Sequence, residues 1–383
     1  MGIYLSILPV LIIGKLISVR CHEKYKNAAH IDLFLTFIPF FMMAIIVGLR
    51  SADVGVDTIN YINLADDYVN YTYRDIFDLS IGQHSLLVGK TELEIGFVCI
   101  TKFLYETFHS SQAILIFMAA VTYFTFWISV NLLSDDPYLS ALMVLSAGYF
   151  TNTLNIARQM TVIGILFVIY YFLLKKNWLA SVILLIFACS LHQTVSLVFL
   201  IMLFLRLIPV RRQYAMIMFG CMFLVVALVH PLAVLFVTYF PKYNGFLAEK
   251  ELLLSIGMIR LLWAVELAFT FYLLLYGFSA IENKALTLYE RHMFCCICFT
   301  YLYIGLYLCG QYVWLVNRFA LYFQLGTIFL FPMVQKRLRQ YAPKPLYFLF
   351  TYGIWLFFIF WYVRSIQNDP TQIANYVSQW LTL

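Results

Sequence analysis

The chain contains 383 residues, of which 63% are hydrophobic and only 11% are charged. Soluble domains carry roughly a quarter charged residues, so this composition excludes a soluble globular protein. Only helices and closed barrels satisfy their backbone in lipid, and the apolar blocks lack the alternation of barrel strands, so we predict an all-α polytopic integral membrane protein. The net charge of +6 is spread between the apolar blocks, which argues against a nucleic-acid partner.

Apolar segments recur along the whole chain. Because about 20 apolar residues cross the hydrocarbon core, they predict about twelve transmembrane helices, within a range of about ten to about fourteen. We predict a single polytopic membrane domain over residues 1–383. The predicted segments are 3–19, 31–49, 112–133, 138–150, 159–174, 178–191, 194–208, 214–233, 258–278, 293–309, 319–334 and 345–363. Segments 138–150 and 194–208 are too short to span alone, so half-helices or re-entrant segments are open to them.

The distribution of Lys and Arg predicts that the chain starts on the outer side. With this orientation, fifteen of the 25 Lys and Arg residues lie in or beside inner loops. They are Lys15, Arg20, Lys24, Lys26, Lys175, Lys176, Arg206, Arg211, Arg212, Lys284, Arg291, Lys336, Arg337, Arg339 and Lys344. Basic residues concentrate in cytoplasmic loops, so this count supports the predicted topology.

Three segments then lie on the outer face. The largest, about 50–111, is rich in Asp, Asn and Tyr and has no long apolar span. The second covers about 236–257, and the third is the short stretch 310–318. Within the largest segment, Glu94–Thr107 predicts an amphipathic helix at the membrane interface.

Arg50 begins the largest outer segment and is followed by Asp53 and Asp57. A guanidinium can bind a phosphate through two hydrogen bonds, and carboxylates can accept protons or hold a metal. The alternative is a solvated helix end with Asp residues in turn positions.

Glu94 precedes the predicted amphipathic helix. A carboxylate in this position commonly does no more than interact with the dipole of the helix. Because Glu94 also lies near an apolar boundary, a raised pKa and a role as a base form the second possibility.

Arg158 interrupts the apolar run 138–174, which has no other charge. An Arg at hydrocarbon depth costs about 2.5–3.5 kcal/mol by insertion scales, so it normally faces a water-filled cavity or holds an anionic partner. Gln159 and Asn155 add hydrogen-bonding groups beside it. The alternative is a structural charge paired with a helix C-terminus or with Glu266, the one acid inside a predicted span.

Two further polar residues face the outer side. His192 interrupts the apolar run 178–205, where a lone His is commonly a hydrogen-bonded core residue. Histidine is also the side chain that most often acts as a general base near neutral pH. Arg318 is another outward-facing guanidinium, able to join Arg158 and Arg50 in binding an anion.

Several common motifs are absent. The chain has no GxxxxGK[ST] phosphate loop, no HExxH helix and no GxSxG elbow, which argues against ATP-driven transport and against a metalloprotease. Cys295, Cys296 and Cys298 lie close together without a fourth ligand nearby, so we predict buried structural thiols. We therefore predict no metal and no cofactor.

Short polar motifs follow one another at the outer helix ends. They are Arg50, Gly55-Val56-Asp57-Thr58 with Tyr61, Glu94-x-Gly96-Phe97, Asn155-x-x-Arg158-Gln159 and His192. Their order and positions, over about residues 48–200, resemble the pattern of the EpsG-like proteins, which are bacterial exopolysaccharide and lipopolysaccharide O-antigen polymerases of the Wzy type. One departure is Val56, where the pattern has a Thr, so a hydroxyl group is lost while Asp57 is kept.

The resemblance implies a glycosyltransferase of the bacterial inner (plasma) membrane. Such polymerases move a glycan from undecaprenyl pyrophosphate onto a lipid-linked repeat unit at the outer leaflet, without a nucleotide or a metal. It implies Arg50, Arg158, Gln159 and Arg318 at the pyrophosphate and Glu94, Asp57 or His192 as the base. The implied partners are undecaprenyl-pyrophosphate-linked oligosaccharide, membrane lipid and a chain-length regulator protein, with no nucleic acid.

Two alternatives come from other classes. A flippase or transporter of lipid-linked sugars would line its path with Arg158 and His192, but it needs polar residues along its whole depth. A membrane glycosyltransferase with a polyprenyl-phosphate sugar donor would use Asp53 and Asp57, and it would add a single sugar.

Overall fold

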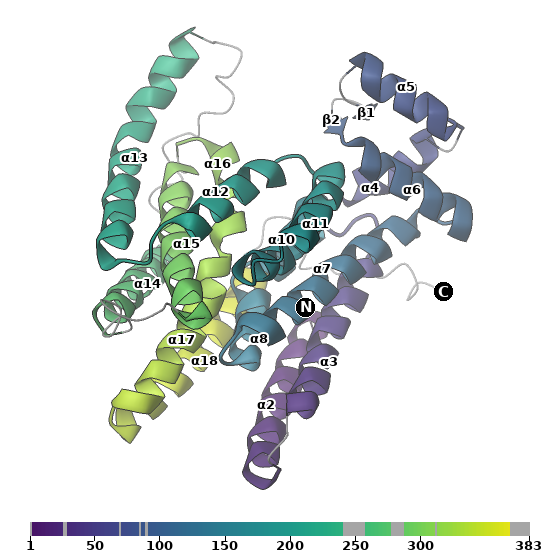
Figure 1. Cartoon of the computed structure of the whole chain (residues 1–383). Helices are drawn as coiled ribbons and strands as arrows, with labels where there is room; N and C mark the ends of the chain where they lie inside the picture. The colour runs from purple at the N-terminus through teal and green to yellow at the C-terminus, as the bar shows by residue number, and fades with distance from the viewer. Residues whose placement is uncertain are drawn as a thin grey trace. The chain divides into compact units, whose positions relative to one another are not determined.

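Helices make up nearly all of the described part of the computed structural model (Figure 1). The structure describes residues 2–25, 29–68, 70–83, 86–88, 91–239, 257–276, 287–310 and 312–367. Within these ranges, seven helices are long and apolar enough to cross a membrane, and four apolar helices are shorter. The seven spans are Gly2–Lys24, Ala29–Gly48, Gln112–Leu133, Ala157–Leu174, Arg212–Leu235, Leu288–Gly310 and Lys344–Gln367. They confirm the predicted all-α polytopic membrane fold.

The chain divides into two compact units. Unit 1 contains Met1–Phe199 and Leu349–Leu383, and unit 2 contains Leu200–Phe348. The single membrane domain expected over residues 1–383 stays a prediction.

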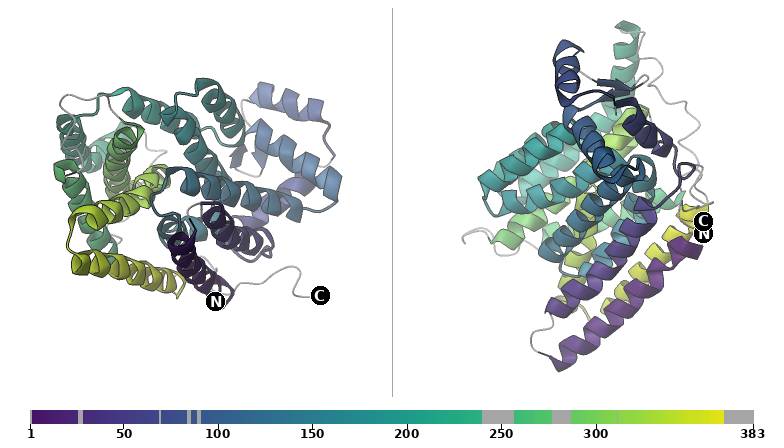
Figure 2. Two further views of the ribbon diagram at one scale, coloured as in Figure 1. Left: turned by 60° about the horizontal axis from the view of Figure 1, so that its bottom comes forward. Right: turned by 90° about the vertical axis from the view of Figure 1, so that its right-hand side faces the viewer.

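The apolar helices of unit 1 pack around α7. These helices are α1 (Gly2–Leu5), α2 (Ile7–Lys24), α3 (Ala29–Gly48), α7 (Gln112–Leu133), α8 (Pro137–Ser146), α9 (Tyr149–Asn155), α10 (Ala157–Leu174) and α11 (Trp178–Leu191). α7 packs against both α3 and α10, and α2 lies beside α3 (Figure 2). A Cβ at Gly164 of α10 would overlap the hydroxyl group of Thr125 on α7, so these two helices approach closely. α10 is apolar on every side beyond its first turn, as expected of a buried helix.

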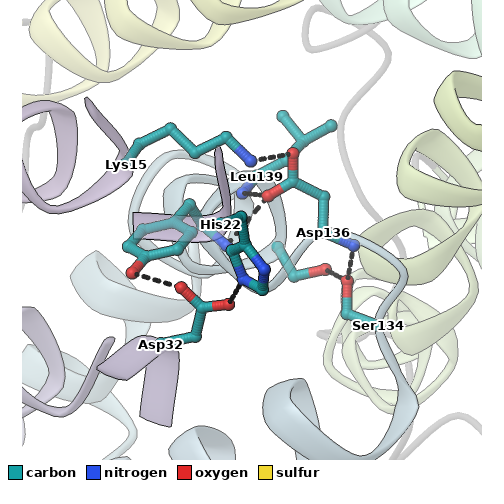
Figure 3. A network of polar contacts seen from close by, with 8 residues as sticks. Lys15, His22, Asp32, Ser134, Asp136 and Leu139 are labelled. Atoms are coloured by element: carbon teal, nitrogen blue, oxygen red, sulfur yellow. Dashed lines mark hydrogen bonds and ion pairs between the residues drawn. The ribbon is translucent and has the colours of Figure 1, made fainter. Parts of the chain in front are cut away.

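A polar network joins α2, α3, α7 and α8 at one end of unit 1 (Figure 3). Lys15 forms an ion pair with Asp136, Nζ to Oδ2 2.8 Å, and the other oxygen of Asp136 caps the start of α8. On α3, Asp32 accepts a hydrogen bond from Tyr138 and lies 2.6 Å from Nε2 of His22. Lys15 therefore ties α2 to the start of α8 by charge, and Asp32 links α3 to both of these helices.

Two breaks interrupt the path from α8 to α10. Gly148, with φ +98°, separates α8 from α9, and Ile156 separates α9 from α10. Positive φ favours glycine, so the first break follows from the sequence. The seven-residue α9 was not predicted, because it is too short to show a periodic pattern. Since α10 begins at Ala157, Arg158 lies in the first turn of a helix.

The polar segment between α3 and α7 folds into short elements. They are α4 (Thr58–Tyr68), α5 (Tyr73–Gln83), β1 (Leu86–Val88), β2 (Thr91–Leu93) and α6 (Ile95–Phe108). The antiparallel pair β1–β2 has Leu86 opposite Leu93. The helix expected over Glu94–Thr107 is confirmed as α6, whereas α4, α5 and the hairpin were not predicted.

Unit 2 is built around α15. Its helices are α13 (Arg212–Tyr239), α14 (Gly257–Tyr276), α15 (Leu288–Gly310), α16 (Trp314–Phe323) and α17 (Leu325–Tyr341), with the end of α12 (Val195–Leu207) and the start of α18 (Lys344–Gln367). α15 packs against α13, α16 and α17. A Cβ at Gly326 would lie 2.6 Å from the carbonyl oxygen of Cys296, so α17 crosses α15 closely there. Most of the outer segment expected at 236–257 lies outside the described residues.

Candidate functional site

One carboxylate, that of Glu94, contacts three groups, one in the first turn of α10 and two just after the end of α11. Its Oε2 accepts a hydrogen bond from Nη1 of Arg158 at 2.5 Å. Its Oε1 lies 3.1 Å from Nδ1 of His192 and accepts the backbone N–H of Gln193 at 2.9 Å. The side chains of Glu94, Arg158 and His192 are 12%, 13% and 20% exposed, so the group is partly shielded but remains open to solvent.

Each member of this group lies at the end of a helix of unit 1. Glu94 is the residue before α6, Arg158 is in the first turn of α10, and His192 follows α11 in an extended conformation. The group was predicted to share the outer side of the protein, and the structure brings all three residues together.

A close approach between α6 and α11 positions Glu94 beside His192. A Cβ at Gly96 would lie 2.5 Å from both Cβ and Oγ of Ser190, so only glycine fits at this crossing. Glu94 stands two residues before Gly96, and His192 stands two residues after Ser190. The Glu94-x-Gly96 pattern therefore has a packing reason as well as a chemical one.

Two aromatic side chains contact Arg158 or pack beside it. Its guanidinium lies 5.4 Å from the centre of the Phe97 ring, which is a cation–π distance. The Tyr61 ring meets Phe97 edge-on at 6.0 Å, and the Tyr61 hydroxyl accepts the backbone N–H of Arg158 at 3.5 Å. Roles for Tyr61 and Phe97 were missed in the sequence, although both residues lie inside the recognised motifs.

The loop after α3 is held against the break between α9 and α10. Gly55 has φ +86°, and a Cβ there would overlap the carbonyl oxygen of Leu154, so this position requires glycine. The next residue, Val56, donates its backbone N–H to Oδ1 of Asn155 at 3.0 Å. Asn155 thus binds the loop, which brings the loop close to Arg158.

Arg50 lies inside the protein. The residue is 0% exposed, and its guanidinium donates to the Thr58 hydroxyl at 3.0 Å and to the carbonyl oxygen of Val47 at 2.6 Å. Gln112 donates to the carbonyl oxygens of Gly48 and Arg50. The sequence led us to expect a guanidinium that faces outward, and the structure instead places it under the loop that it begins.

The remaining predicted site residues lie in different settings. Asp57 is half-buried at the end of the loop, and Gln159 is buried beside Arg158 on α10. Arg318 is exposed on α16 of unit 2, and its place in the site stays a prediction. The sequence offered a helix C-terminus or Glu266 as a structural partner of Arg158, and within unit 1 its acid partner is Glu94.

The contacts of Glu94 control its ionisation. Burial raises the pKa of its carboxyl group, but the His192 hydrogen bond, the Arg158 charge and the Gln193 N–H together outweigh burial and lower it. The raised pKa considered from the sequence is therefore wrong. Glu94 is an ionised carboxylate whose oxygens are occupied by donors, which suits it to orient its neighbours.

The phenol of Tyr61 is neutral at physiological pH. Burial raises its pKa, the Arg158 charge lowers it, and the Asp57 charge raises it again, with a net upward shift. A protonated Tyr61 can accept from the Arg158 backbone and donate its own proton at the same time.

The described residues offer no group of three His, Cys, Asp or Glu side chains that could hold a metal ion. Cys295, Cys296 and Cys298 are buried free thiols, in agreement with their predicted structural role. Cys296 lies 3.5 Å from Nδ1 of His292, one turn earlier on α15.

Comparison with known proteins identifies the family. No curated protein and no solved structure matches the chain. The model of the EpsG family matches residues 33–378, which cover most of the chain, including all the residues of this site. The chain therefore belongs to the EpsG family, and at this level it is a multi-pass membrane protein of the polysaccharide-polymerase type.

Proposed function

We propose that the chain is a polymerase that transfers a glycan from undecaprenyl pyrophosphate onto a lipid-linked repeat unit at the outer leaflet of a bacterial inner membrane. The observation that carries the proposal is the contact of Glu94 with both Arg158 and His192. It joins a cation for a leaving phosphate to a base for an attacking hydroxyl, and these are the two groups that such a transfer needs.

Arg158 binds the pyrophosphate in this proposal. A guanidinium has five N–H groups, and the Glu94 contact through Nη1 leaves others to donate to phosphate oxygens. Arg158 also lies at the N-terminus of α10, where backbone N–H groups and the helix dipole favour an anion. Both effects stabilise negative charge as the bond to the leaving oxygen breaks.

His192 acts as the base. Its Nδ1 is held by Glu94, so Nε2 is the nitrogen that can accept a proton from the acceptor sugar. As this proton moves to Nε2, the acceptor oxygen forms a bond to the anomeric carbon of the donor. The bond from that carbon to the phosphate oxygen breaks, and the pyrophosphate leaves with the electron pair. Glu94 stabilises the resulting imidazolium.

Other residues of the motifs complete the proposed site. Arg50 positions the loop through Thr58, and Tyr61 donates a hydrogen bond to the phosphate or to the acceptor. Asp57 stays an alternative base, and Gln159 and Arg318 stay proposed contacts of the pyrophosphate. The leaving group is already activated, so the reaction needs no nucleotide and no added cofactor. A chain-length regulator is the proposed protein partner.

The distribution of charge along α10 favours an enzyme over a flippase. Arg158 is the one charged residue of α10, and beyond it the helix runs through apolar residues to Leu174. A path for a charged headgroup would need polar groups along its depth. The polar groups of this helix instead gather at the end where Glu94 and His192 meet it.

The test is replacement of Arg158 in a strain that lacks the chromosomal copy. Arg158→Ala is expected to lower polymerisation by about 10²–10³-fold, by analogy with removal of an oxyanion donor. The polymer ladder should be lost while single lipid-linked repeat units persist on the outer face. Arg74→Ala, which removes an exposed arginine of the same unit, should leave the ladder unchanged. A full ladder from inserted Arg158→Ala protein rejects the proposal, and repeat units trapped on the inner face indicate a flippase.

A further inference from the structure

Unit 2 contains a buried polar cluster of residues that the proposed reaction does not use. It consists of Glu266 and Trp263 on α14, Tyr303 on α15 and Thr327 on α17. Glu266 and Thr327 are 0% exposed, and the other two side chains are almost fully buried. A glutamate without a charged partner is rarely found fully buried.

The Tyr303 hydroxyl accepts a hydrogen bond from Nε2 of Gln324 at 3.3 Å, but the other polar atoms of this cluster lack such partners among the described residues. In the described part of the chain, neither carboxyl oxygen of Glu266 has a hydrogen-bond partner. The same holds for Nε1 of Trp263 and for the hydroxyl group of Thr327. Buried polar groups are nearly always hydrogen-bonded, so several such atoms in one place indicate a bound species that is not protein.

These atoms lie close to one another. Trp263 and Glu266 are three residues apart on α14, so their side chains share one face of the helix. The Thr327 hydroxyl and the Tyr303 phenol are both neighbours of the Glu266 carboxyl group. The Trp263 ring also packs edge-on against Tyr307 at 5.2 Å, which closes the cluster on the α15 side.

The surroundings of Glu266 favour its neutral form. An ionised carboxylate at zero exposure is very costly unless a cation and several hydrogen bonds compensate it. The groups beside it are the Thr327 hydroxyl and the Tyr303 phenol, and neither carries a positive charge. Protonation of the carboxyl group removes the charge and so avoids the cost of burying it.

The mixture of hydrogen-bond donors and acceptors in the cluster indicates which small species binds there. The indole N–H of Trp263 is a donor only, so it does not suit a metal cation. The carbonyl oxygen of a protonated carboxyl group is an acceptor, and the Thr327 hydroxyl is both. Water is the small species that can serve all three at once. We propose that Glu266 is a proton-binding site, with its neutral carboxyl group bridged by bound water to Trp263 and Thr327.

Infrared spectroscopy of the purified full-length protein tests the proton directly. The wild type should show the carbonyl band of a protonated carboxylic acid at neutral pH, shifted in D₂O, and Glu266→Gln should lose it. The matched control Glu23→Gln replaces an exposed glutamate and should keep the band. If Glu266→Gln does not fold, Trp263→Phe serves instead, because loss of the indole donor should move the band to higher frequency. A wild-type spectrum without this band overturns the proposal.

Thermal unfolding distinguishes a proton from a metal cation. A carboxyl group that is protonated in the fold but ionised in the unfolded chain loses stability as the pH rises. The Tm of Glu266→Gln, relative to the wild type, should therefore increase with pH. Replacing sodium and potassium chloride with choline chloride should leave the wild-type Tm unchanged. A Tm that depends on sodium or potassium, and loses this dependence in Glu266→Gln, would show a cation site and overturn the proposal.

Discussion

Oε2 of Glu94 and Nη1 of Arg158 lie 2.5 Å apart, although the two residues are separated by 64 positions in the sequence. The same carboxylate holds His192 through its other oxygen. An anion that approaches Arg158 therefore meets a guanidinium that already has one partner and a fixed direction. A change at Glu94 should disturb the cation and the base together.

Glu94→Gln is expected to lower polymer formation by at least about 10²-fold, because loss of the acid that orients a histidine is costly even when shape is kept. Polymer ladder length and turnover of lipid-linked donor provide the measurement. Glu92→Gln, two residues earlier in the chain, is the control and should retain activity. If Glu94→Gln turned over at the wild-type rate, the carboxylate of Glu94 would have no role in the reaction.

The lowered pKa of Glu94 predicts a loss of stability in acid. A carboxyl group whose pKa is lower in the fold contributes stability that is present above its unfolded pKa of about 4.3 and is lost as pH falls through the folded value. The wild type should therefore lose Tm relative to Glu94→Gln as the pH falls below about 5. Equal slopes for the two proteins across this range would contradict the ion pair.

His192→Ala should lower the rate by about 10²–10⁴-fold, which is the range for loss of a general base. His192→Gln keeps a hydrogen-bond donor for Glu94, so its Tm should stay near that of the wild type. Because it has no basic nitrogen, its rate should fall as far as that of His192→Ala. Added imidazole should partly restore turnover by His192→Ala. If His192→Gln is fully active, Asp57 becomes the better candidate for the base.

Gly96→Ala should separate Glu94 from His192, because the new methyl group meets Ser190 at 2.5 Å. Overpacking of this kind typically costs about 1–3 kcal/mol. Ser190→Gly removes the Cβ and Oγ that cause part of the clash, so the double variant should recover part of both Tm and activity. An absence of coupling between the two changes, measured as a double-mutant cycle, would argue against this crossing.

Gly55→Ala should destabilise the loop after α3 by more than about 1 kcal/mol, because φ is positive and Leu154 occupies the space. Limited proteolysis of the segment between α3 and α7, together with the Tm, measures the effect. Gly353→Ala is the matched control on α18, where a Cβ meets nothing within 4 Å, and it should be neutral or stabilising. Similar Tm values for both variants would contradict the packing of Gly55.

The membrane helices were largely predictable, since the thickness of lipid sets both their length and their composition. Segments 112–133 and 178–191 match α7 and α11 in full, and the expected helix after Glu94 is α6. The short elements α4, α5 and α9 were missed, because polar helices of two or three turns leave no strong periodic signal.

The members of the site were predictable, but their contacts were not. Arg158 and His192 interrupt apolar runs. Because a polar group in lipid is costly, such interruptions identify candidate site residues from the sequence alone. Their shared partner was not visible, because the pairing of Glu94 with Arg158 depends on how α6, α10 and α11 pack. The burial of Arg50 was missed for the same reason, since a buried and an exposed arginine at a helix end look identical in sequence.

The ion pair between Lys15 and Asp136 has a consequence for biosynthesis. Lys15 lies within the first membrane span, and its acid partner is 121 residues further along the chain. While a ribosome is still translating the segment between them, the first helical hairpin lacks the acid that pairs with Lys15 in the fold. A chain that has not yet reached Asp136 therefore carries a lysine inside a membrane span without the acid that pairs with it, an arrangement that insertion scales make costly.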